Sequence, residues 1–270
     1  MKKRQLLVGG GKMGTALLTG WLKRGAEPAN LFVVEPSDGA RGVVASQGVT
    51  AVRSSSDLPS GFAPDVVIFA VKPQVMEEVV PAYAGFKELG AFYLSIAAGK
   101  PISFFESMLG TDAAIVRTMP NTPAAVGRGI TVLYANASTA DASKNVAEEL
   151  LGAVGETAWV EDEALLDAVT AVSGSGPAYV FYLIECLASA GASIGLPPDL
   201  AMRLARATVC GAGELAYRET TAAETLRQNV TSPGGTTEAA LQVLMDGDGL
   251  DPLIRRAVRA ATRRSIELAG

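Results

Sequence analysis

The chain has 270 residues, of which 49% are hydrophobic and only 19% charged, and its formal net charge is −5. This composition excludes a disordered chain, and the length suits one large domain or two smaller ones. The negative charge argues against nucleic acid or an anionic membrane surface as a partner, and no segment reaches transmembrane length.

The basic N-terminus Met1-Lys2-Lys3-Arg4 runs directly into a short apolar stretch and then glycines, which leaves no apolar core for a signal peptide. The two cysteines, Cys186 and Cys210, lie in apolar helical stretches. This placement predicts small buried side chains in a protein of a reducing compartment. We therefore expect a cytoplasmic protein, and we expect no metal site.

The first 160 residues alternate short β-rich apolar runs with helical segments. Buried strands separated by helices are typical of a doubly wound, mostly parallel sheet of the Rossmann type. The expected strands are Gln5–Val8, Leu31–Glu35, Val66–Val71, Ala91–Ala97, Ala114–Met119 and Gly129–Ala135. The expected helices are Gly14–Arg24, Gln74–Tyr83 and Ala142–Leu151.

A glycine-rich turn follows the first expected strand and opens the first helix. It reads Gly9-Gly10-Gly11-Lys12-Met13-Gly14 and matches the pattern G-x-G-x-x-G. In this context the first glycine permits a tight turn, the second lets the backbone approach a pyrophosphate, and the third permits close helix–strand packing. The turn therefore predicts a dinucleotide site.

Glu35 ends the second expected strand, 21 residues beyond Gly14. An acid at this place accepts hydrogen bonds from the adenosine ribose hydroxyls and repels a 2′-phosphate, which favours NADH. Ser37 and Arg41 lie just beyond and would bind a 2′-phosphate if Glu35 turned outward. The use of NADPH therefore stays open.

Two further strand ends are expected to line the cofactor, because ligands bind at the carboxyl ends of strands in open sheets. One reads Ala70-Val71-Lys72-Pro73 and the other Met119-Pro120-Asn121-Thr122-Pro123. Lys72 is either a cation for the chemistry or, as is more usual for a lysine at a strand end, a structural or solvated side chain.

The β-rich pattern stops near residue 162. We therefore predict a dinucleotide-binding domain over residues 1–162 and an all-α domain for substrate binding and dimerisation over residues 163–270. The expected helices are Glu163–Val172, Pro177–Ile194, Asp199–Tyr217, Ala222–Gln228, Thr236–Met245 and Asp251–Leu268.

The expected helix Pro177–Ile194 is apolar over most of its circumference. Apart from two tyrosine hydroxyls, its polar side chains are Glu185, Ser189 and Ser193, spaced four apart in one narrow stripe. A helix of this kind is buried on most sides. Because a helical domain of roughly 100 residues can hardly bury it alone, we predict an intertwined homodimer. The alternative is the central helix of a monomeric bundle.

Residues Asn229 to Thr237 read Asn-Val-Thr-Ser-Pro-Gly-Gly-Thr-Thr and directly precede an apolar helical run. Hydroxyls and backbone N–H groups at a helix start form a receptor for a carboxylate or phosphate. The chain contains no histidine. Reduction of a ketone needs a proton donor for the alkoxide, whereas a protonated cyclic imine is already an electrophile. These features favour a nicotinamide enzyme that reduces an imine.

Over nearly its full length the chain resembles the pyrroline-5-carboxylate reductase family, the last enzymes of proline synthesis. The blocks that carry the resemblance are Gly9–Gly14, Ala70–Pro73, Ser95–Gly99, Met119–Pro123, Val172–Tyr179 and Asn229–Thr237. The last two, in this order and separation, are the most specific. The Ser173–Pro177 part of one block is either a ligand contact or a means of close helix packing.

The resemblance implies transfer of a hydride from NAD(P)H to the C5 imine carbon of 1-pyrroline-5-carboxylate, which gives L-proline. It implies that the substrate carboxylate lies in the loop Ser232 to Thr237, bound by Ser232, Gly234, Gly235, Thr236 and Thr237. The residue matching Thr237 contacts the ring nitrogen or donates its proton, and Ser232 stands beside it as a further candidate catalytic residue.

The resemblance also implies cofactor contacts and an assembly. Asn229 matches a residue near the cofactor, Val8 to Met13 and Ala70 to Pro73 match dinucleotide contacts, and Ser55 matches a polar residue that binds ribose. Members of the family are dimers with interlocked C-terminal helices, and many build decamers. Because members often carry small or basic residues where Glu35 stands, the preference between NADPH and NADH is open.

Two other classes of protein share some of these features. β-Hydroxyacid dehydrogenases share the glycine-rich opening but carry a lysine four residues after a Gly-x-Gly motif in the second domain, where this chain has Val180 after Gly176 and no lysine beyond Lys144. A regulatory protein that binds a dinucleotide without catalysis has no need of the second anion-binding loop at Asn229–Thr237.

Overall fold

The structure is a computed structural model and describes residues 3–269. The chain separates into two compact units. One consists of Met1–Gly174 together with Thr262–Gly270, and the other of Ser175–Ala261. The change from mixed α/β to helical secondary structure near residue 162 and the boundary of the compact units thus fall at different places in the chain.

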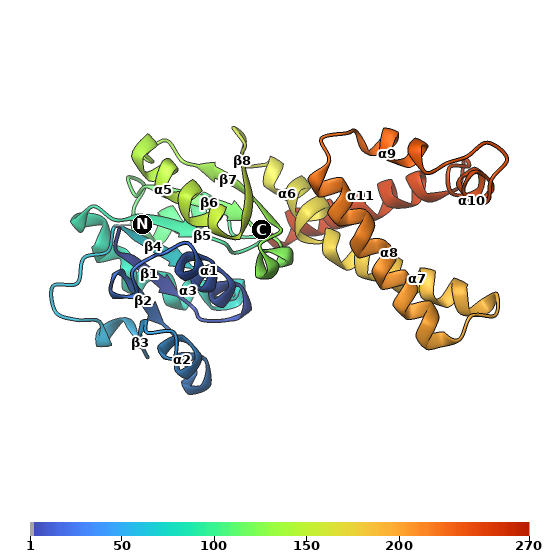
Figure 1. The fold of residues 1–270 in the computed structure, drawn as a ribbon. Coiled ribbons are helices and arrows are strands. Elements are labelled where there is room, and N and C mark those ends of the chain that lie inside the picture. The colour runs from blue at the N-terminus through green and yellow to red at the C-terminus, as the bar shows by residue number, and fades with distance from the viewer. Residues whose placement is uncertain (1–2, 270) are drawn as a thin grey trace. The chain divides into compact units, whose positions relative to one another are not determined.

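The first unit is built on one eight-stranded sheet, as far as the described residues show (Figure 1). Its strand order is β3-β2-β1-β4-β5-β6-β7-β8, and all neighbours are parallel except the antiparallel pair β6 and β7. The strands are β1 (Gln5–Val8), β2 (Leu31–Val34), β3 (Thr50–Val52), β4 (Val66–Phe69), β5 (Phe92–Ser95), β6 (Ile115–Met119), β7 (Gly129–Ala135) and β8 (Gly155–Trp159). The predicted mostly parallel, doubly wound sheet is confirmed.

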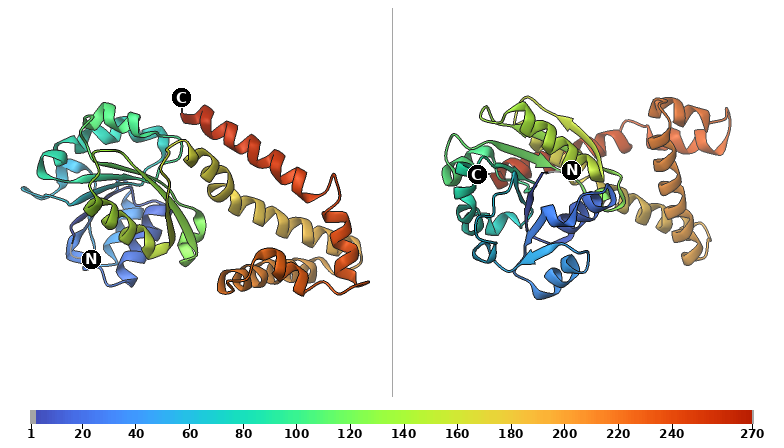
Figure 2. Two further views of the ribbon diagram at one scale, coloured as in Figure 1. Left: turned by 90° about the horizontal axis from the view of Figure 1, so that it is seen from above. Right: turned by 60° about the vertical axis from the view of Figure 1, so that its left-hand side comes forward.

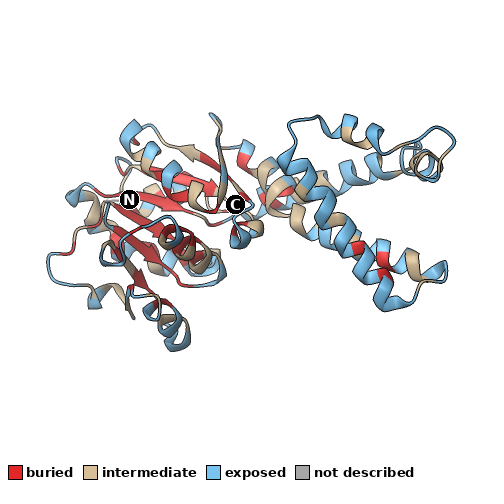
Figure 3. Ribbon diagram, in the orientation of Figure 1, coloured by how far each residue is buried: buried red, intermediate tan, exposed pale blue. Residues whose placement is uncertain are grey.

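Side chains of each strand alternate between two cores. Leu7 of β1 lies in one core with Leu18 and Trp21, while Leu6 lies in the other with Phe105. The first core is formed with helices α1 (Lys12–Lys23) and α5 (Asp141–Leu151), and the second with α3 (Met76–Val79) and α4 (Ile102–Leu109). Because both faces of the sheet are covered, its central strands β1, β4, β5 and β6 are almost fully buried (Figure 3).

Several elements differ from the sequence prediction. Strands β3 and β8 and helices α2 (Asp38–Ala45) and α4 were not predicted. Strand β3 has only three residues, and β8 alternates between exposed and half-buried positions, so neither gives a buried apolar run. The predicted helix Gln74–Tyr83 is largely 3₁₀, with α-helix only at α3, because Pro81 lacks the N–H that an α-helix would use there.

The helices predicted beyond residue 163 are confirmed with small shifts at their ends. They are α6 (Leu165–Val169), α7 (Gly176–Ser193), α8 (Pro198–Arg218), α9 (Ala223–Asn229), α10 (Thr236–Leu244) and α11 (Leu250–Ala269). Helices α7 and α8 pack against each other, as the two views of Figure 2 also show. Helix α11 ends in the first unit, because Thr262–Gly270 belongs to it.

Helix α7 is not the centre of a monomeric bundle. In the single chain Ala188 is its buried residue, whereas Phe181 is 59% and Tyr182 66% exposed. Cys186 and Cys210, which were expected to be buried, are also exposed in the single chain. Much of the apolar surface of α7 is therefore exposed in the single chain. No helix in the described part of the chain is long and apolar enough to cross a membrane.

Candidate active site

The predicted dinucleotide residues gather at the carboxyl ends of three neighbouring strands. Strand β1 lies between β2 and β4, and the helical segments that follow β1 and β4 lie on opposite faces of the sheet. Gly9 follows β1, Glu35 follows β2 and Ala70 follows β4. A crevice at such a point of the strand order is where open α/β sheets bind ligands.

The glycine turn has the backbone that the G-x-G-x-x-G pattern predicts. Gly9 has a φ of 104° and donates its N–H to the carbonyl of Val34, at 2.9 Å. A Cβ on Gly14 would lie 2.2 Å from the carbonyl oxygen of Gly9, so only glycine allows α1 to pack this closely on the turn. At Gly11, the N-cap of α1, a Cβ would meet no atom within 4 Å. The turn is thus tight at both ends and open where a phosphate would approach.

The carboxylate of Glu35 lies beside this turn. One of its oxygens accepts from the N–H of Gly10 at 2.7 Å, and the other accepts from the N–H of Ser37 at 2.8 Å. The side chain is therefore held toward the dinucleotide crevice. The guanidinium of Arg41 donates to the carbonyls of Glu35 and Pro36 and forms an ion pair with Asp38. The Glu35 side chain is thus not turned outward, and the guanidinium of Arg41 is engaged by the neighbouring chain rather than free to bind a 2′-phosphate.

The remaining predicted cofactor residues of the first unit also follow strand ends. The N–H of Ala70 bonds to the carbonyl of Val8 at 2.8 Å, which joins the end of β4 to the end of β1. Lys72 is the extended residue before a 3₁₀ turn that begins at Pro73. Ser55 begins a 3₁₀ turn shortly after β3, next to the capping box that Ser54 forms with Asp57.

Asn121 follows β6, and its side chain is engaged inside the protein. The amide oxygen accepts from the N–H of Ile130 at 3.0 Å, and the amide nitrogen donates to the hydroxyl oxygen of Ser173 at 3.2 Å. Sequence reasoning assigned this residue to the cofactor and did not foresee either bond.

A buried ion pair near this strand end was also missed. Arg117 of β6 bonds to the carboxylate of Glu163 at 2.7 Å, and the same oxygen accepts from the N–H of Ile102, the first residue of α4, at 2.8 Å. The Arg117 side chain is only 6% exposed. A charged residue in the middle of an apolar strand was the signal that could have predicted a buried partner.

The predicted substrate-binding residues lie together in the second unit, in the loop between α9 and α10 and in the first turn of α10. Asn229 is the last residue of α9, and Gly235 is the N-cap of α10. The N–H of Gly235 bonds to the carbonyl of Ser232 at 3.0 Å, which closes the turn. The N–H of Gly234 donates to a carboxylate oxygen of Glu238 at 2.6 Å. The first N–H groups of an α-helix have no partner within the helix, so Thr236 and Thr237 present donors at this loop.

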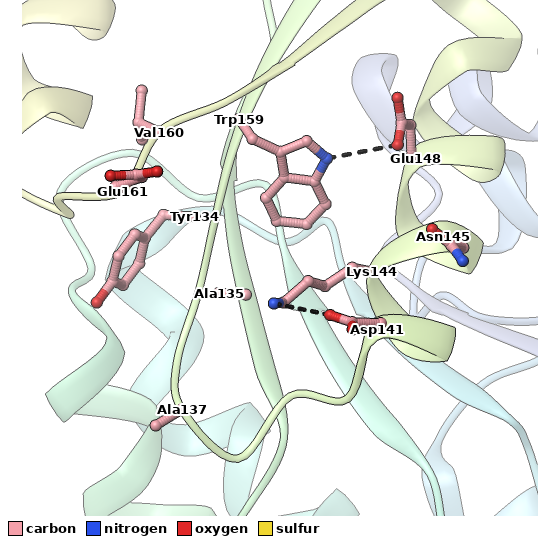
Figure 4. A pocket seen from close by; sticks show the side chains of 10 residues that line it. All are labelled: Tyr134, Ala135, Ala137, Asp141, Lys144, Asn145, Glu148, Trp159, Val160 and Glu161. Atoms are coloured by element: carbon pink, nitrogen blue, oxygen red, sulfur yellow. Dashed lines mark hydrogen bonds and ion pairs between the residues drawn. The ribbon is translucent and has the colours of Figure 1, made fainter.

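A groove of about 570 Å³ lies elsewhere on the first unit (Figure 4). It is lined by residues of β7, α5 and β8, among them Tyr134, Lys144 and Trp159. Because β7 runs antiparallel to β6, the carboxyl ends of β7 and β8 lie at the opposite edge of the sheet from the glycine turn. No predicted site residue lines this groove.

The chain is similar to known proteins over nearly its whole length. The family model described as pyrroline-5-carboxylate reductase dimerisation matches residues 163–268. Among curated relatives, pyrroline-5-carboxylate reductase of Pseudomonas aeruginosa is 40% identical over 267 residues, which cover 98% of this chain and 97% of that protein. The chain belongs to the pyrroline-5-carboxylate reductase family.

Other relatives and solved structures extend the match. The reductase of Pisum sativum is 36% identical over 97% of this chain and 94% of its own length. The structure of a pyrroline-5-carboxylate reductase from Coxiella burnetii has a TM-score of 0.94 and 35% identity, with both chains covered completely. That of Plasmodium falciparum pyrroline carboxylate reductase with NADP bound has a TM-score of 0.83 and 28% identity, with 100% and 99% of the chains covered.

A second family model, described as NADP oxidoreductase coenzyme F420-dependent, matches residues 5–99. This range contains the glycine turn, Glu35 and the Ala70–Pro73 strand end. Members of the pyrroline-5-carboxylate reductase family are oxidoreductases of proline biosynthesis, and this chain is an oxidoreductase that uses a nicotinamide dinucleotide. The alternatives, a β-hydroxyacid-dehydrogenase-like enzyme and a non-catalytic regulator, are not favoured by any of these matches.

Proposed function

We propose that the chain reduces 1-pyrroline-5-carboxylate to L-proline by passing a hydride from a nicotinamide dinucleotide to the C5 imine carbon. The observation that carries this proposal is the similarity to curated reductases over 98% of the chain, because it spans the residues of both compact units. The direct test follows the nicotinamide absorbance of purified protein with pyrroline-5-carboxylate. Absence of oxidation with both NADH and NADPH would contradict the proposal.

The substrate carboxylate is assigned to the loop formed by Ser232, Gly234, Gly235, Thr236 and Thr237. The bond from the Gly234 N–H to the Glu238 carboxylate supports this assignment, because it has the same chemistry as an amide that holds a substrate carboxylate. A carboxylate also offsets the positive charge of a protonated imine. Thr237 and Ser232 are the hydroxyls assigned to the reacting ring, with Thr237 contacting the ring nitrogen or donating its proton.

Replacement of Thr237 by valine tests this role, because valine keeps the shape and removes the hydroxyl. We expect Thr237→Val to lower kcat by roughly a hundredfold with dinucleotide affinity nearly unchanged. Thr221→Val, which removes an exposed hydroxyl outside the loop, is the matched control and should keep wild-type turnover. Equal turnover of Thr237→Val and the control would remove Thr237 from the mechanism.

The dinucleotide is assigned to the crevice at the carboxyl ends of β1, β2 and β4. The proposed contacts are Val8, Gly9, Gly10, Gly11, Lys12, Met13, Gly14, Glu35, Ser37, Ser55, Ala70, Val71, Lys72, Pro73, Asn121 and Asn229. Asn121 would contribute through its backbone, since its amide side chain is bonded to Ile130 and Ser173.

We propose NADH as the preferred cofactor. The Glu35 carboxylate is fixed by two backbone N–H groups, and a 2′-phosphate beside it would meet a like charge. Glu35→Ser should raise kcat/KM for NADPH relative to NADH by roughly tenfold or more, as expected for a repulsion of about 1–2 kcal/mol between partly solvated charges. Glu27→Ser removes an exposed acid before the same strand and serves as the control. An unchanged ratio in Glu35→Ser would show that Glu35 does not set the preference.

We propose that residues 163–270 act as the substrate-binding and dimerisation domain and that two copies interlock through α7, with a decamer as a possible higher assembly. The support is the match of residues 163–268 to the dimerisation model and the exposed apolar side chains of α7. Phe181→Asp should yield monomers in sedimentation velocity, whereas Val43→Asp, at an exposed valine of α2, should not. A Phe181→Asp protein of wild-type size would contradict this interface. We also propose a cytoplasmic location, in keeping with the two cysteines, Cys186 and Cys210, which form no disulfide.

A further inference from the structure

The side chain of Asn121 joins two sequence motifs that lie 52 residues apart. One is Met119–Pro123 at the end of β6, and the other contains Ser173. The amide nitrogen donates to the Ser173 hydroxyl, while the amide oxygen is used by Ile130 of β7. Because both ends of the amide are engaged, the side chain has one fixed orientation.

Ser173 lies in an unusual piece of backbone. Residues Thr170–Gly174 form a π-helix that continues α6. Turns of this type are rare and are found frequently at functional sites. A Cβ on Gly174 would lie 2.2 Å from the terminal methyl of Met119, so the flexible Met119 side chain packs directly against this glycine. The end of β6 therefore contacts the π-helical segment twice, through an apolar contact at Gly174 and a hydrogen bond at Ser173.

The returning chain is held near the same helix. The hydroxyl of Ser265, a residue only 5% exposed, donates to the carboxylate of Asp167 on α6 at 2.6 Å. The chain leaves the first compact unit after Gly174 and re-enters it at Thr262. A side-chain hydrogen bond inside the first unit therefore lies close to each of these two points. The Asn121–Ser173 bond lies just before the chain leaves the unit, and the Ser265–Asp167 bond lies just after it returns.

This placement matters for the reaction, because Asn121 belongs to the proposed dinucleotide contacts, and the segment that it holds ends at Gly174, the last residue before the chain leaves the first unit. Hydride transfer needs the donor and acceptor carbons in a defined geometry, and errors of about 1 Å reduce rates strongly. We propose that Asn121 is a positioning residue for hydride transfer. Through Ser173 it holds the π-helical segment, from which the chain continues to the substrate-binding unit, in one geometry. This inference rests on the reductase activity proposed above.

The test removes the hydroxyl of Ser173 and leaves Asn121 bonded to Ile130. We expect Ser173→Ala to lower kcat by roughly tenfold, with the KM for the dinucleotide within about twofold of wild type. With dinucleotide deuterated at the transferred position, the isotope effect on kcat should increase, because hydride transfer becomes slower relative to product release. Thr170→Val is the matched control: it removes a hydroxyl of the same segment that bonds to the Leu166 carbonyl and not to Asn121. It should keep the wild-type kcat and isotope effect.

Two further measurements make the outcome decisive. In the double variant Asn121→Ala/Ser173→Ala, kcat should equal that of Asn121→Ala alone, because the two side chains act as one unit. Hydrogen exchange of the Thr170–Gly174 backbone should be faster in Ser173→Ala than in wild type. An unchanged isotope effect, an equal loss in Thr170→Val, or unchanged exchange would each overturn the proposal. The hydrogen-exchange comparison tests whether Ser173 holds the Thr170–Gly174 segment, and it does not depend on activity. Inactivity of the wild-type protein would instead refute the proposed function.

Discussion

Replacement of Glu163 by alanine tests how far the first unit depends on one carboxylate. Glu163 is bonded both to Arg117 at 2.7 Å and to the N–H of Ile102 at 2.8 Å. The Arg117 side chain is 6% exposed and that of Glu163 25%. If the ion pair is broken, water can therefore hydrate the Glu163 carboxylate better than the Arg117 guanidinium.

Loss of the carboxylate leaves the Arg117 charge buried without this partner, which typically destabilises a protein by about 3–5 kcal/mol. The bond to the Ile102 N–H, worth about 1 kcal/mol, is lost as well. We expect Glu163→Ala to lower the free energy of unfolding by about 4–6 kcal/mol. Arg117→Met removes the buried charge itself, and Glu163 can still bind Ile102 and turn toward water, so about 1–2 kcal/mol is expected.

Urea unfolding, followed by the fluorescence of buried Trp21 in the same unit, measures these differences. All variants must be compared at one protein concentration, because self-association adds to apparent stability. Glu161→Ala, at an exposed acid two residues earlier, is the control and should change stability by less than about 0.5 kcal/mol. The reasoning is refuted if Glu163→Ala is no more destabilising than Arg117→Met, or if adding Arg117→Met to Glu163→Ala recovers no stability.

Three further outcomes follow from the structure. Gly14→Ala should abolish dinucleotide binding in a fluorescence titration, whereas Gly42→Ala, in open space within α2, should stabilise the protein by about 0.5–1 kcal/mol; retained binding in the first variant would contradict the close packing. Burial raises the pKa of Tyr83 and of Tyr93 to about 12, so absorbance at alkaline pH should show these two tyrosines ionising last, and stability should fall from about pH 10 to 12. Although burial alone would raise the pKa of Asp65, the Arg4 N–H and Lys3 lower it below its usual value. Its contribution to stability is therefore present above the unfolded-state pKa and lost in acid, and Asp65→Asn should flatten stability in that acid range; an unchanged acid profile would contradict this.

Much of the fold could be predicted because buried parallel strands appear in the sequence as continuous apolar runs. The bounds of β1 and β7 were predicted to the residue, and all six helices beyond residue 163 were predicted. Strand β8 was missed because an edge strand with one exposed face needs no such run. The helix predicted over Gln74–Tyr83 is α-helical only at Met76–Val79 and otherwise 3₁₀, because Pro81 has no N–H for an α-helical hydrogen bond.

In the candidate site, too, the local features could be predicted from the sequence and the non-local ones could not. The glycine turn and the loop before α10 are formed by residues adjacent in the chain, so spacing and residue type predicted their local structure. The orientation of Glu35 toward Gly10 depends on the alignment of β1 with β2, a non-local pairing. The uncovered surface of α7 also became visible only in the folded chain, since the same apolar pattern suits a bundle core and an interface between copies.

Local patterns in the chain were enough to predict the class of protein: an α/β part, a helical part and two turns that we propose bind anions. The pairing of distant polar groups inside the first unit became visible only in the tertiary structure. Asn121 meets Ser173 across 52 residues, and Arg117 meets Glu163 across 46. Hydrogen bonds between residues so far apart leave no periodic trace in a sequence. Their partners are fixed by which strands and helices pack together, and packing is a property of the whole fold.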